Sequence, residues 1–138
     1  MSLQREMFER PTPQVVTLGL DLSLTATGAV VLGEDGSIEV AFTVGYPLDK
    51  KASAKKRICR LIDIWQTIWT QAFSARRDAD RPIPSLVGIE GYAYKAMGRG
   101  KEVAELHGLV KVMLYSQANL VPRIANPSSV KKDIFGHG

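Results

Sequence analysis

The chain has 138 residues, of which 45% are hydrophobic, and this is enough for one domain with one core. A single cysteine, Cys59, excludes an intramolecular disulfide, and no stretch approaches the roughly 20 apolar residues of a membrane-spanning helix. The net charge of +4 arises in residues 95–138, which hold seven basic and three acidic side chains, whereas residues 1–94 hold 11 of each. This bias favours a polyanionic partner.

Residues 1–13 form a polar N-terminal segment that lacks the apolar core of a signal peptide. We expect a flexible arm there, a cytoplasmic location, and one folded unit over residues 14–138. Cys59 falls in a helical pattern, where we expect it to be buried or half-buried.

The first 45 residues predict a meander of three antiparallel strands. Residues 14–21 are an apolar, β-branched run that ends in Asp21, and Gly28–Leu32 resumes a strand after a turn. The sequence Asp35-Gly36 is typical of a tight hairpin turn, and residues 37–44 then form the third strand.

A long helix is predicted over residues 53–76, because apolar side chains recur there at three- and four-residue steps. The predicted apolar face consists of Ile58, Leu61, Ile62, Trp65, Ile68, Trp69 and Ala72. Cations crowd the start of this helix, where they oppose the helix dipole. They are Lys50, Lys51, Lys55, Lys56, Arg57 and Arg60. We interpret them first as solvated side chains, with contact to DNA as the alternative.

The second half of the chain predicts alternating strands and helices. Residues 85–90 are a short apolar run that ends in Glu90, and a loop follows over residues 92–100. A helix is predicted over residues 101–118, with Ala104 and Gly108 allowing close approach of a neighbour. Its predicted face is Val103, Leu106, Val110, Met113, Leu114 and Gln117. A short strand within residues 119–125 and a helix over residues 128–135 complete the chain.

This order of elements predicts an α/β fold of the ribonuclease H-like class. Three strands come first, and helices and strands then alternate, which gives a five-stranded mixed sheet flanked by helices. Three of its strands are antiparallel and the next two are parallel.

Two predicted strands end in carboxylates, Asp21 and Glu90. We expect parallel neighbouring strands to bring these acids to one edge of the sheet, where ligands gather in open α/β folds. Two adjacent carboxylates need a proton or a cation, and oxygen ligands favour Mg²⁺ or Mn²⁺. A pair of ions about 4 Å apart activates water and stabilises the leaving oxygen in phosphodiester hydrolysis. The spacing alone equally allows Asp21 as a turn cap and Glu90 as a solvated strand end.

Three segments resemble the motifs of RuvC-type Holliday junction resolvases and occur in that family's order. Gly19–Gly28 (GLDLSLTATG) resembles the first motif, and Val87–Glu90 (VGIE) is similar to the second. Asn126–Lys132 (NPSSVKK) with Phe135–Gly138 (FGHG) resembles the third, P-x-x-V-K-K followed by G-x-G. The resemblance implies a structure-selective endonuclease that resolves four-way (Holliday) or branched DNA junctions by metal-dependent hydrolysis.

The resemblance also implies roles for particular residues. Asp21 and Glu90 match the catalytic acids that bind Mg²⁺ or Mn²⁺, with two ions in the complete site. For Tyr92 and Tyr94, stacking on unpaired bases and a plain core or surface position are both open. The expected contacts to DNA are Lys131, Lys132, Arg99, Lys101, Tyr92 and Tyr94.

A homodimer is implied as well, because paired nicks across a junction need two active sites. The candidate interfaces are the aromatic residues Trp65, Trp69 and Phe73, or the helix that carries Ala104 and Gly108; membership of the monomer core is the alternative for both. His107 and His137 have no partner histidine at metal-ligand spacing, and we interpret both as structural or solvated.

The family places its remaining ligands on a helix beyond the G-x-G, whereas this sequence ends at Gly138. We therefore expect these residues to lack the final C-terminal helix, to bind metal weakly and to cleave little by themselves. Two rival functions remain. One is a non-catalytic DNA-binding or dimerisation module of the same fold. The other is a fragment of an actin-like ATP-binding fold, whose phosphate loop Asp21–Thr25 fits loosely.

Overall fold

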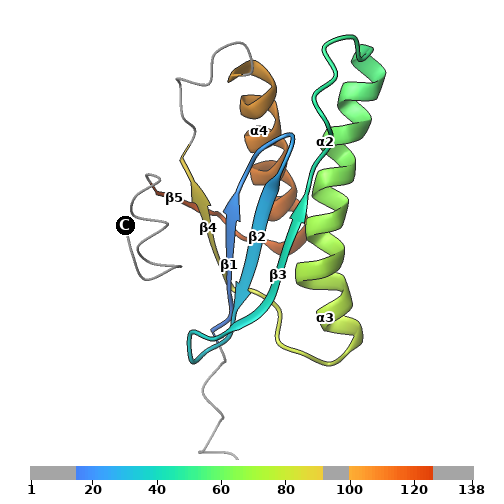
Figure 1. Cartoon of the computed structure of the whole chain (residues 1–138). Coiled ribbons are helices and arrows are strands. Elements are labelled where there is room, and N and C mark those ends of the chain that lie inside the picture. Colours follow the sequence, from blue (N-terminus) through green and yellow to red (C-terminus); the bar gives the residue numbers. More distant parts are fainter. Residues whose placement is uncertain (1–14, 92–99, 126–138) are drawn as a thin grey trace, which may run out of the picture.

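The computed structural model describes residues 15–91 and 100–125. These residues form a five-stranded sheet in the order β3-β2-β1-β4-β5 (Figure 1). The strands are β1 (Thr17–Asp21), β2 (Thr27–Leu32), β3 (Ile38–Val44), β4 (Leu86–Glu90) and β5 (Arg123–Ala125). β1 pairs antiparallel with β2, and β2 with β3, whereas β4 runs parallel to both β1 and β5. The predicted mixed sheet is confirmed.

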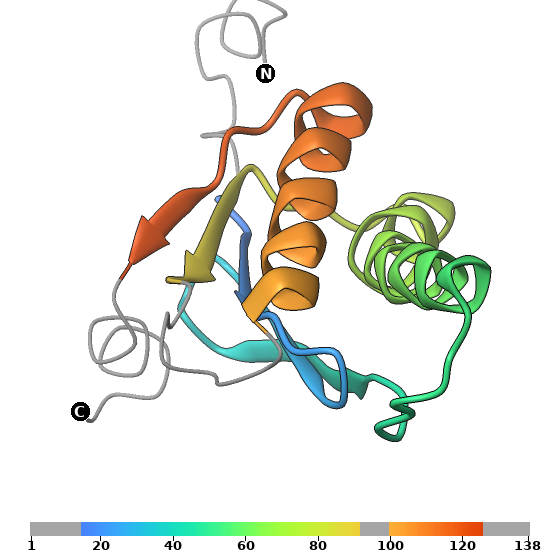
Figure 2. The same cartoon turned by 90° about the horizontal axis from the view of Figure 1, so that it is seen from above.

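Two long helical segments cover one side of this sheet (Figure 2). The first consists of α2 (Ala54–Trp69), the π-helical turn η1 (Thr70–Ser74) and α3 (Ala75–Asp78), and the second is α4 (Gly100–Ala118). The Ser53 side chain caps α2 by accepting a hydrogen bond from the Lys56 backbone N–H at 3.2 Å. No helix within residues 15–91 and 100–125 is long and apolar enough to cross a membrane.

The core lies between the sheet and these helices. Side chains alternate along each strand, and Leu18, Leu20, Val87 and Ile89 are all buried. They belong to one hydrophobic cluster with residues of both helices; the helical members include Ile64, Ile68, Phe73, Leu106, Val110 and Leu114. Burial of each large aliphatic side chain stabilises the fold by about 1.5–3 kcal/mol relative to exposure. The alternation leaves Gly19, Asp21, Gly88 and Glu90 directed away from the cluster.

The predicted helix faces are only partly correct. Ile58 and Ile62 are 55% and 41% exposed, whereas Ile64, absent from the predicted face, is fully buried. Leu61, between these two positions, is buried, so the core-facing side of α2 is centred on Leu61, Ile64 and Ile68 and leaves Ile58 and Ile62 at its margin. Cys59, on the same part of the helix, is exposed rather than buried.

The second helix also differs from expectation at three positions. Ala104 is exposed, and a Cβ placed on Gly108 would meet no atom of the described residues within 4 Å, so the predicted close approach is wrong. Gln117 is exposed and accepts a hydrogen bond from the indole Nε1 of Trp65 at 3.2 Å. It therefore supplies a polar partner for a buried tryptophan and does not extend the apolar face.

The hairpin between β2 and β3 is longer than the tight turn predicted from Asp35-Gly36. The backbone N–H of Gly33 donates to the Ser37 carbonyl at 2.9 Å, which leaves a loop of three residues between them. Gly36 has φ +83°, a left-handed conformation that glycine adopts without steric cost. The strand pairing on either side is as predicted.

An ion pair between a buried arginine and a more exposed glutamate joins the end of the long helical segment to the edge strand β3. Arg76 is 3% exposed, and its Nη2 lies 2.7 Å from the Glu39 carboxylate. Its Nε also donates to the Pro82 carbonyl at 2.7 Å. Arg76 therefore fixes both the helix end and the loop that leads into β4.

Candidate functional site

The structure places Asp21 and Glu90 side by side at one edge of the sheet. The parallel register pairs Leu18 with Val87 and Leu20 with Ile89. Asp21 and Glu90 are the next residues on these strands, so they follow in the same register. Asp21 is exposed and Glu90 is half-buried. The predicted juxtaposition of the two acids is confirmed, and their role in binding metal stays a prediction.

The loop after Asp21 is held by its own serine and threonine side chains. The backbone N–H groups of Thr25 and Ala26 both donate to Ser23 Oγ at 3.3 Å, and that of Ser23 donates to Thr27 Oγ1 at 3.0 Å. Thr27 is fully buried. These side-chain contacts explain the serine and threonines of the segment Ser23-Leu-Thr-Ala-Thr27. They stabilise a sharp turn that returns the chain beside Asp21.

Glycines keep backbone segments close around the two acids. Gly28 pairs with Asp21, and a Cβ there would lie 3.9 Å from the Asp21 Cβ, which is ordinary contact. At Gly45 a Cβ would lie 2.2 Å from the Thr25 carbonyl oxygen, and at Gly91 it would lie 2.9 Å from that of Ala125. Glycine at 45 and 91 therefore lets the segments after β3 and β4 pass close to their neighbours.

His107 belongs to the surroundings of the acidic pair, which its position in the sequence did not indicate. It lies on the sheet-facing side of α4 and is 6% exposed. Burial lowers the pKa of His107, as does the charge of Lys111, while the charge of Asp21 raises it. The interpretation of His107 as structural agrees with its burial, and the influence of Asp21 shows that the two residues are close enough to interact electrostatically.

The donor chemistry of Asp21 and Glu90 fits a hard divalent cation, but these residues do not complete its coordination. Both supply only carboxylate oxygens, the ligands that Mg²⁺ and Mn²⁺ prefer. Within residues 15–91 and 100–125, no group of three or more His, Cys, Asp or Glu side chains is arranged to hold a metal ion. The pair therefore constitutes part of a possible metal site.

Of the residues predicted to contact DNA, only Lys101 lies within the described residues. Lys101 is exposed in the first turn of α4. The remaining predicted contacts, Tyr92, Tyr94, Arg99, Lys131 and Lys132, lie outside the described residues, as does His137. Trp65 and Phe73 are 3% and 0% exposed and belong to the monomer core, whereas Trp69 is half-buried, so a dimer surface that includes Trp69 stays a prediction.

A charged pocket beside the acidic edge was not foreseen from the sequence. It is a cavity of about 50 Å³ between the β1–β2 loop, the segment after β3, and the first turns of α2 and α4. Its polar lining includes Tyr46, Asp49, Arg57, Arg60 and Glu102. Asp49 and Glu102 carry no local motif, and only the tertiary fold brings them to these arginines.

Comparison with solved structures identifies the fold of the chain, whereas comparison of sequences assigns it to no family. No protein-family model matches the sequence, and no curated protein matches it. The solved structures include Thermus thermophilus RuvC, with a TM-score of 0.62 and 20% identity over 89% of this chain and 70% of that one. Thermus thermophilus RuvC in complex with Holliday junction substrate gives a TM-score of 0.57 and 17% identity over 89% of this chain and 80% of that one. The chain therefore has the ribonuclease H-like fold in a RuvC-like form.

Proposed function

We propose that the chain is the nuclease core of a structure-selective endonuclease that hydrolyses phosphodiesters at four-way or branched DNA junctions. The observation that carries the proposal is the register that sets Asp21 beside Glu90 at the carboxyl edge of two parallel strands. The fold likeness to RuvC, solved both alone and with a Holliday junction, supports the same reading. The three sequence motifs agree with it.

In this proposal Asp21 and Glu90 hold Mg²⁺ or Mn²⁺. Bound there, the cation supplies activation of water and stabilisation of charge on the leaving oxygen. The Ser23–Thr27 turn and Gly28 fix the position of Asp21, and the pairing of β4 between β1 and β5 fixes that of Glu90. By the resemblance, the ligands beyond these two lie on a helix that follows the Phe135–Gly138 motif.

This proposal also assigns contacts to DNA. Lys101 stands at the start of α4, where an exposed cation can meet a backbone phosphate. By resemblance, Arg99, Lys131 and Lys132 bind phosphates as well, and Tyr92 and Tyr94 stack on unpaired bases.

We also propose a homodimer, since a four-way junction offers two equivalent strands to cut. With Trp65 and Phe73 in the core, the interface falls to the outer side of α4. Ala104 and Gly108 are exposed there, and Val112 and Tyr115 are 64% and 61% exposed. Small residues beside large apolar ones suit the packing of a helix against its symmetry mate.

The test is cleavage of a labelled four-way junction and of a linear duplex with the same sequences, by the protein at the full length that its gene encodes. We expect nicking of the junction near its crossover in Mg²⁺ or Mn²⁺, none in EDTA, and at least about tenfold slower nicking of the duplex. Junction binding without cleavage in any divalent ion would favour a non-catalytic module. Tight binding of ATP without junction binding would favour the actin-like alternative.

A further inference from the structure

The first turn of α2 and the segment just before it carry five exposed cations that the proposed active site does not use. They are Lys50, Lys51, Lys55, Lys56 and Arg57, here named the α2 basic surface. The first turn of α2 contains no acidic residue. Cations at this end of a helix are unfavourable, because they face the positive end of the helix dipole. The stability of the helix therefore does not account for them.

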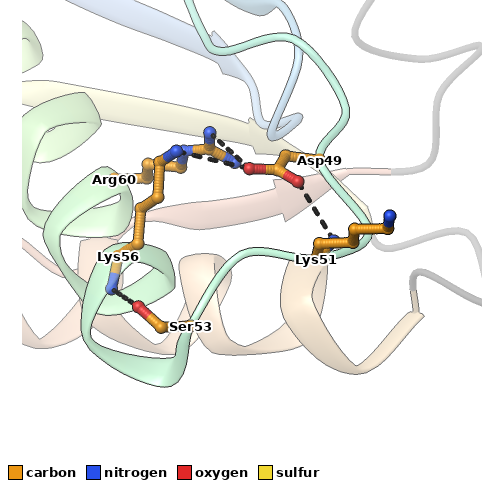
Figure 3. A network of polar contacts seen from close by, with 5 residues as sticks. All are labelled: Asp49, Lys51, Ser53, Lys56 and Arg60. Atoms are coloured by element: carbon orange, nitrogen blue, oxygen red, sulfur yellow. Dashed lines mark hydrogen bonds and ion pairs between the residues drawn. The ribbon is translucent and has the colours of Figure 1, made fainter.

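Neighbouring acids neutralise only part of this charge. Asp49 Oδ2 lies 3.3 Å from Lys56 Nζ and 3.6 Å from Arg60 Nη2, so one carboxylate serves two cations (Figure 3). Donation by the Lys51 backbone N–H and by Lys56 lowers the pKa of Asp49, which keeps it ionised. Glu102 of α4 lies 3.4 Å from Arg57. Lys50, Lys51 and Lys55 have no carboxylate partner within 4 Å in the part of the chain that the structure describes.

The fold holds this surface at the edge of the sheet where β1 ends in Asp21 and β4 ends in Glu90. β1 and β3 both run antiparallel to β2, so the chain leaves β3 at that same edge and enters α2 there (Figure 1). The backbone N–H of Tyr46 donates to the Leu24 carbonyl at 3.0 Å, which ties this connection to the loop after Asp21. The Arg57–Glu102 pair ties the start of α2 to the start of α4.

Arg60 links α2 to the segment before it through contacts with Tyr46 and Asp49. Its guanidinium carbon lies 5.6 Å from the centre of the Tyr46 ring, and the Tyr46 hydroxyl donates to Asp63 at 2.9 Å. The segment that carries Lys50 and Lys51 is thus attached to α2 at several points, while the lysine side chains themselves remain exposed.

We propose that the α2 basic surface binds the phosphate backbone of one DNA arm that extends from the acidic edge. Lysines on flexible stems fit this partner because they meet phosphates as point charges and read no base sequence. Duplex DNA presents about one negative charge per 1.7 Å, so several lysines can be matched at once. This inference deepens the proposed function and rests on it, because the arm belongs to the same DNA that reaches Asp21 and Glu90.

The test compares Lys51→Gln/Lys55→Gln with Arg77→Gln/Arg81→Gln. The control removes the same charge from two exposed residues, Arg77 in α3 and Arg81 in the loop that follows it, at the far end of the helical segment. Binding of a four-way junction in EDTA is measured at several salt concentrations. Each phosphate contact contributes about 0.9 to the slope of log K against log salt, so we expect the lysine pair to reduce the slope by about 2 and the control by less than about 0.5. The lysine variant should bind about tenfold or more weakly at moderate salt.

Two further measurements locate the contact and check the fold. Shortening the junction arms from about 15 to about 6 base pairs should weaken the wild type more than the lysine variant, because the variant has already lost the distal contact. The lysine variant should melt at or slightly above the wild-type temperature, as expected when cations leave a helix N-terminus. Lys51→Arg/Lys55→Arg should restore the slope.

The outcomes separate this inference from the proposed function. An unchanged slope and affinity in the lysine variant, with a junction-binding and metal-dependent wild type, would overturn the inference and leave the nuclease proposal standing. Loss of binding to anionic lipid vesicles, but not to DNA, would overturn it in favour of a membrane surface. A reduced slope in a protein that never nicks would retain the DNA surface and contradict the nuclease proposal.

Discussion

Asp21 and Glu90 place two negative charges on adjacent strands, and such a pair attracts a cation. A ligand that binds only the native state raises the midpoint of thermal unfolding, and this gives a readout independent of cleavage. We expect Mn²⁺ at millimolar concentration to stabilise the wild type and to have little effect on Glu90→Gln.

The matched control for this measurement is Glu34→Gln. Glu34 is an exposed carboxylate in the β2–β3 hairpin, at the opposite edge of the sheet from Asp21. This variant should keep the full Mn²⁺ response. Equal responses in Glu90→Gln and the wild type would show that the ion binds elsewhere.

The burial of His107 predicts a pH dependence of stability. Because the folded-state pKa of His107 is lowered, the unfolded chain binds a proton more readily below its ordinary pKa of about 6.5. Stability should therefore fall as the pH drops from about 7 towards 5, by at most about 1.4 kcal/mol per pH unit for one proton. Urea unfolding at a series of pH values in EDTA measures this slope.

Two variants test whether His107 is the source. His107→Gln should flatten the slope over that pH range, since no proton is then taken up at this position. Lys111→Gln should flatten it partly, because the Lys111 charge contributes to lowering the pKa of His107. A slope that persists unchanged in His107→Gln would assign it to another group.

At the scale of elements, the acidic edge depends on close approach between loops that are distant in sequence. A Cβ on Gly45 would lie 2.2 Å from the Thr25 carbonyl oxygen and 2.7 Å from the Ala26 nitrogen. Both are backbone atoms, so the segment after β3 must move away from the loop after Asp21. We expect Gly45→Ala to lower the free energy of unfolding by about 2–4 kcal/mol.

Gly108→Ala is the contrasting substitution. Gly108 lies within α4, and no atom of the described residues of the same chain lies within 4 Å of its Cβ position, so in the monomer alanine should raise the free energy of unfolding by about 0.5–1 kcal/mol through its higher helix propensity. Chemical denaturation of both variants measures the two effects. Equal small effects at both positions would contradict the packing described around Gly45.

Local patterns in the sequence were sufficient to predict the order of elements, the sheet and the meeting of Asp21 with Glu90. Each of these follows from strand periodicity and from the rule that parallel strands end at one edge. The exposure of Ile58 and the burial of Ile64 were not predictable in this way, because they depend on which side of α2 the sheet and α4 cover. The proximity of His107 to Asp21 and the Arg76–Glu39 pair likewise require the tertiary fold.

In the whole molecule, the described helices lie on one side of the sheet (Figure 2), and β1 and β4 end in the acids Asp21 and Glu90. The outer side of α4 is the surface that we assign to a dimer. Val112→Glu would bury charges at a two-fold interface and should shift the protein towards monomer.

The control for the dimer is Val121→Glu, because Val121 is 77% exposed in the segment before β5, away from α4. It should leave the oligomeric state unchanged. Sedimentation velocity over a range of concentrations measures both variants. A wild type that is monomeric at all concentrations would contradict the proposed homodimer.

We propose that Asp21 and Glu90 catalyse metal-dependent cleavage of branched DNA. The most direct measurement is the nicking of a four-way junction by Asp21→Asn in the full-length protein in Mg²⁺, beside Glu34→Gln and the wild type. We expect Asp21→Asn to nick at least about a thousandfold more slowly, as for loss of a group central to transition-state stabilisation, while it binds the junction with wild-type affinity. Undiminished nicking by Asp21→Asn would contradict the claim.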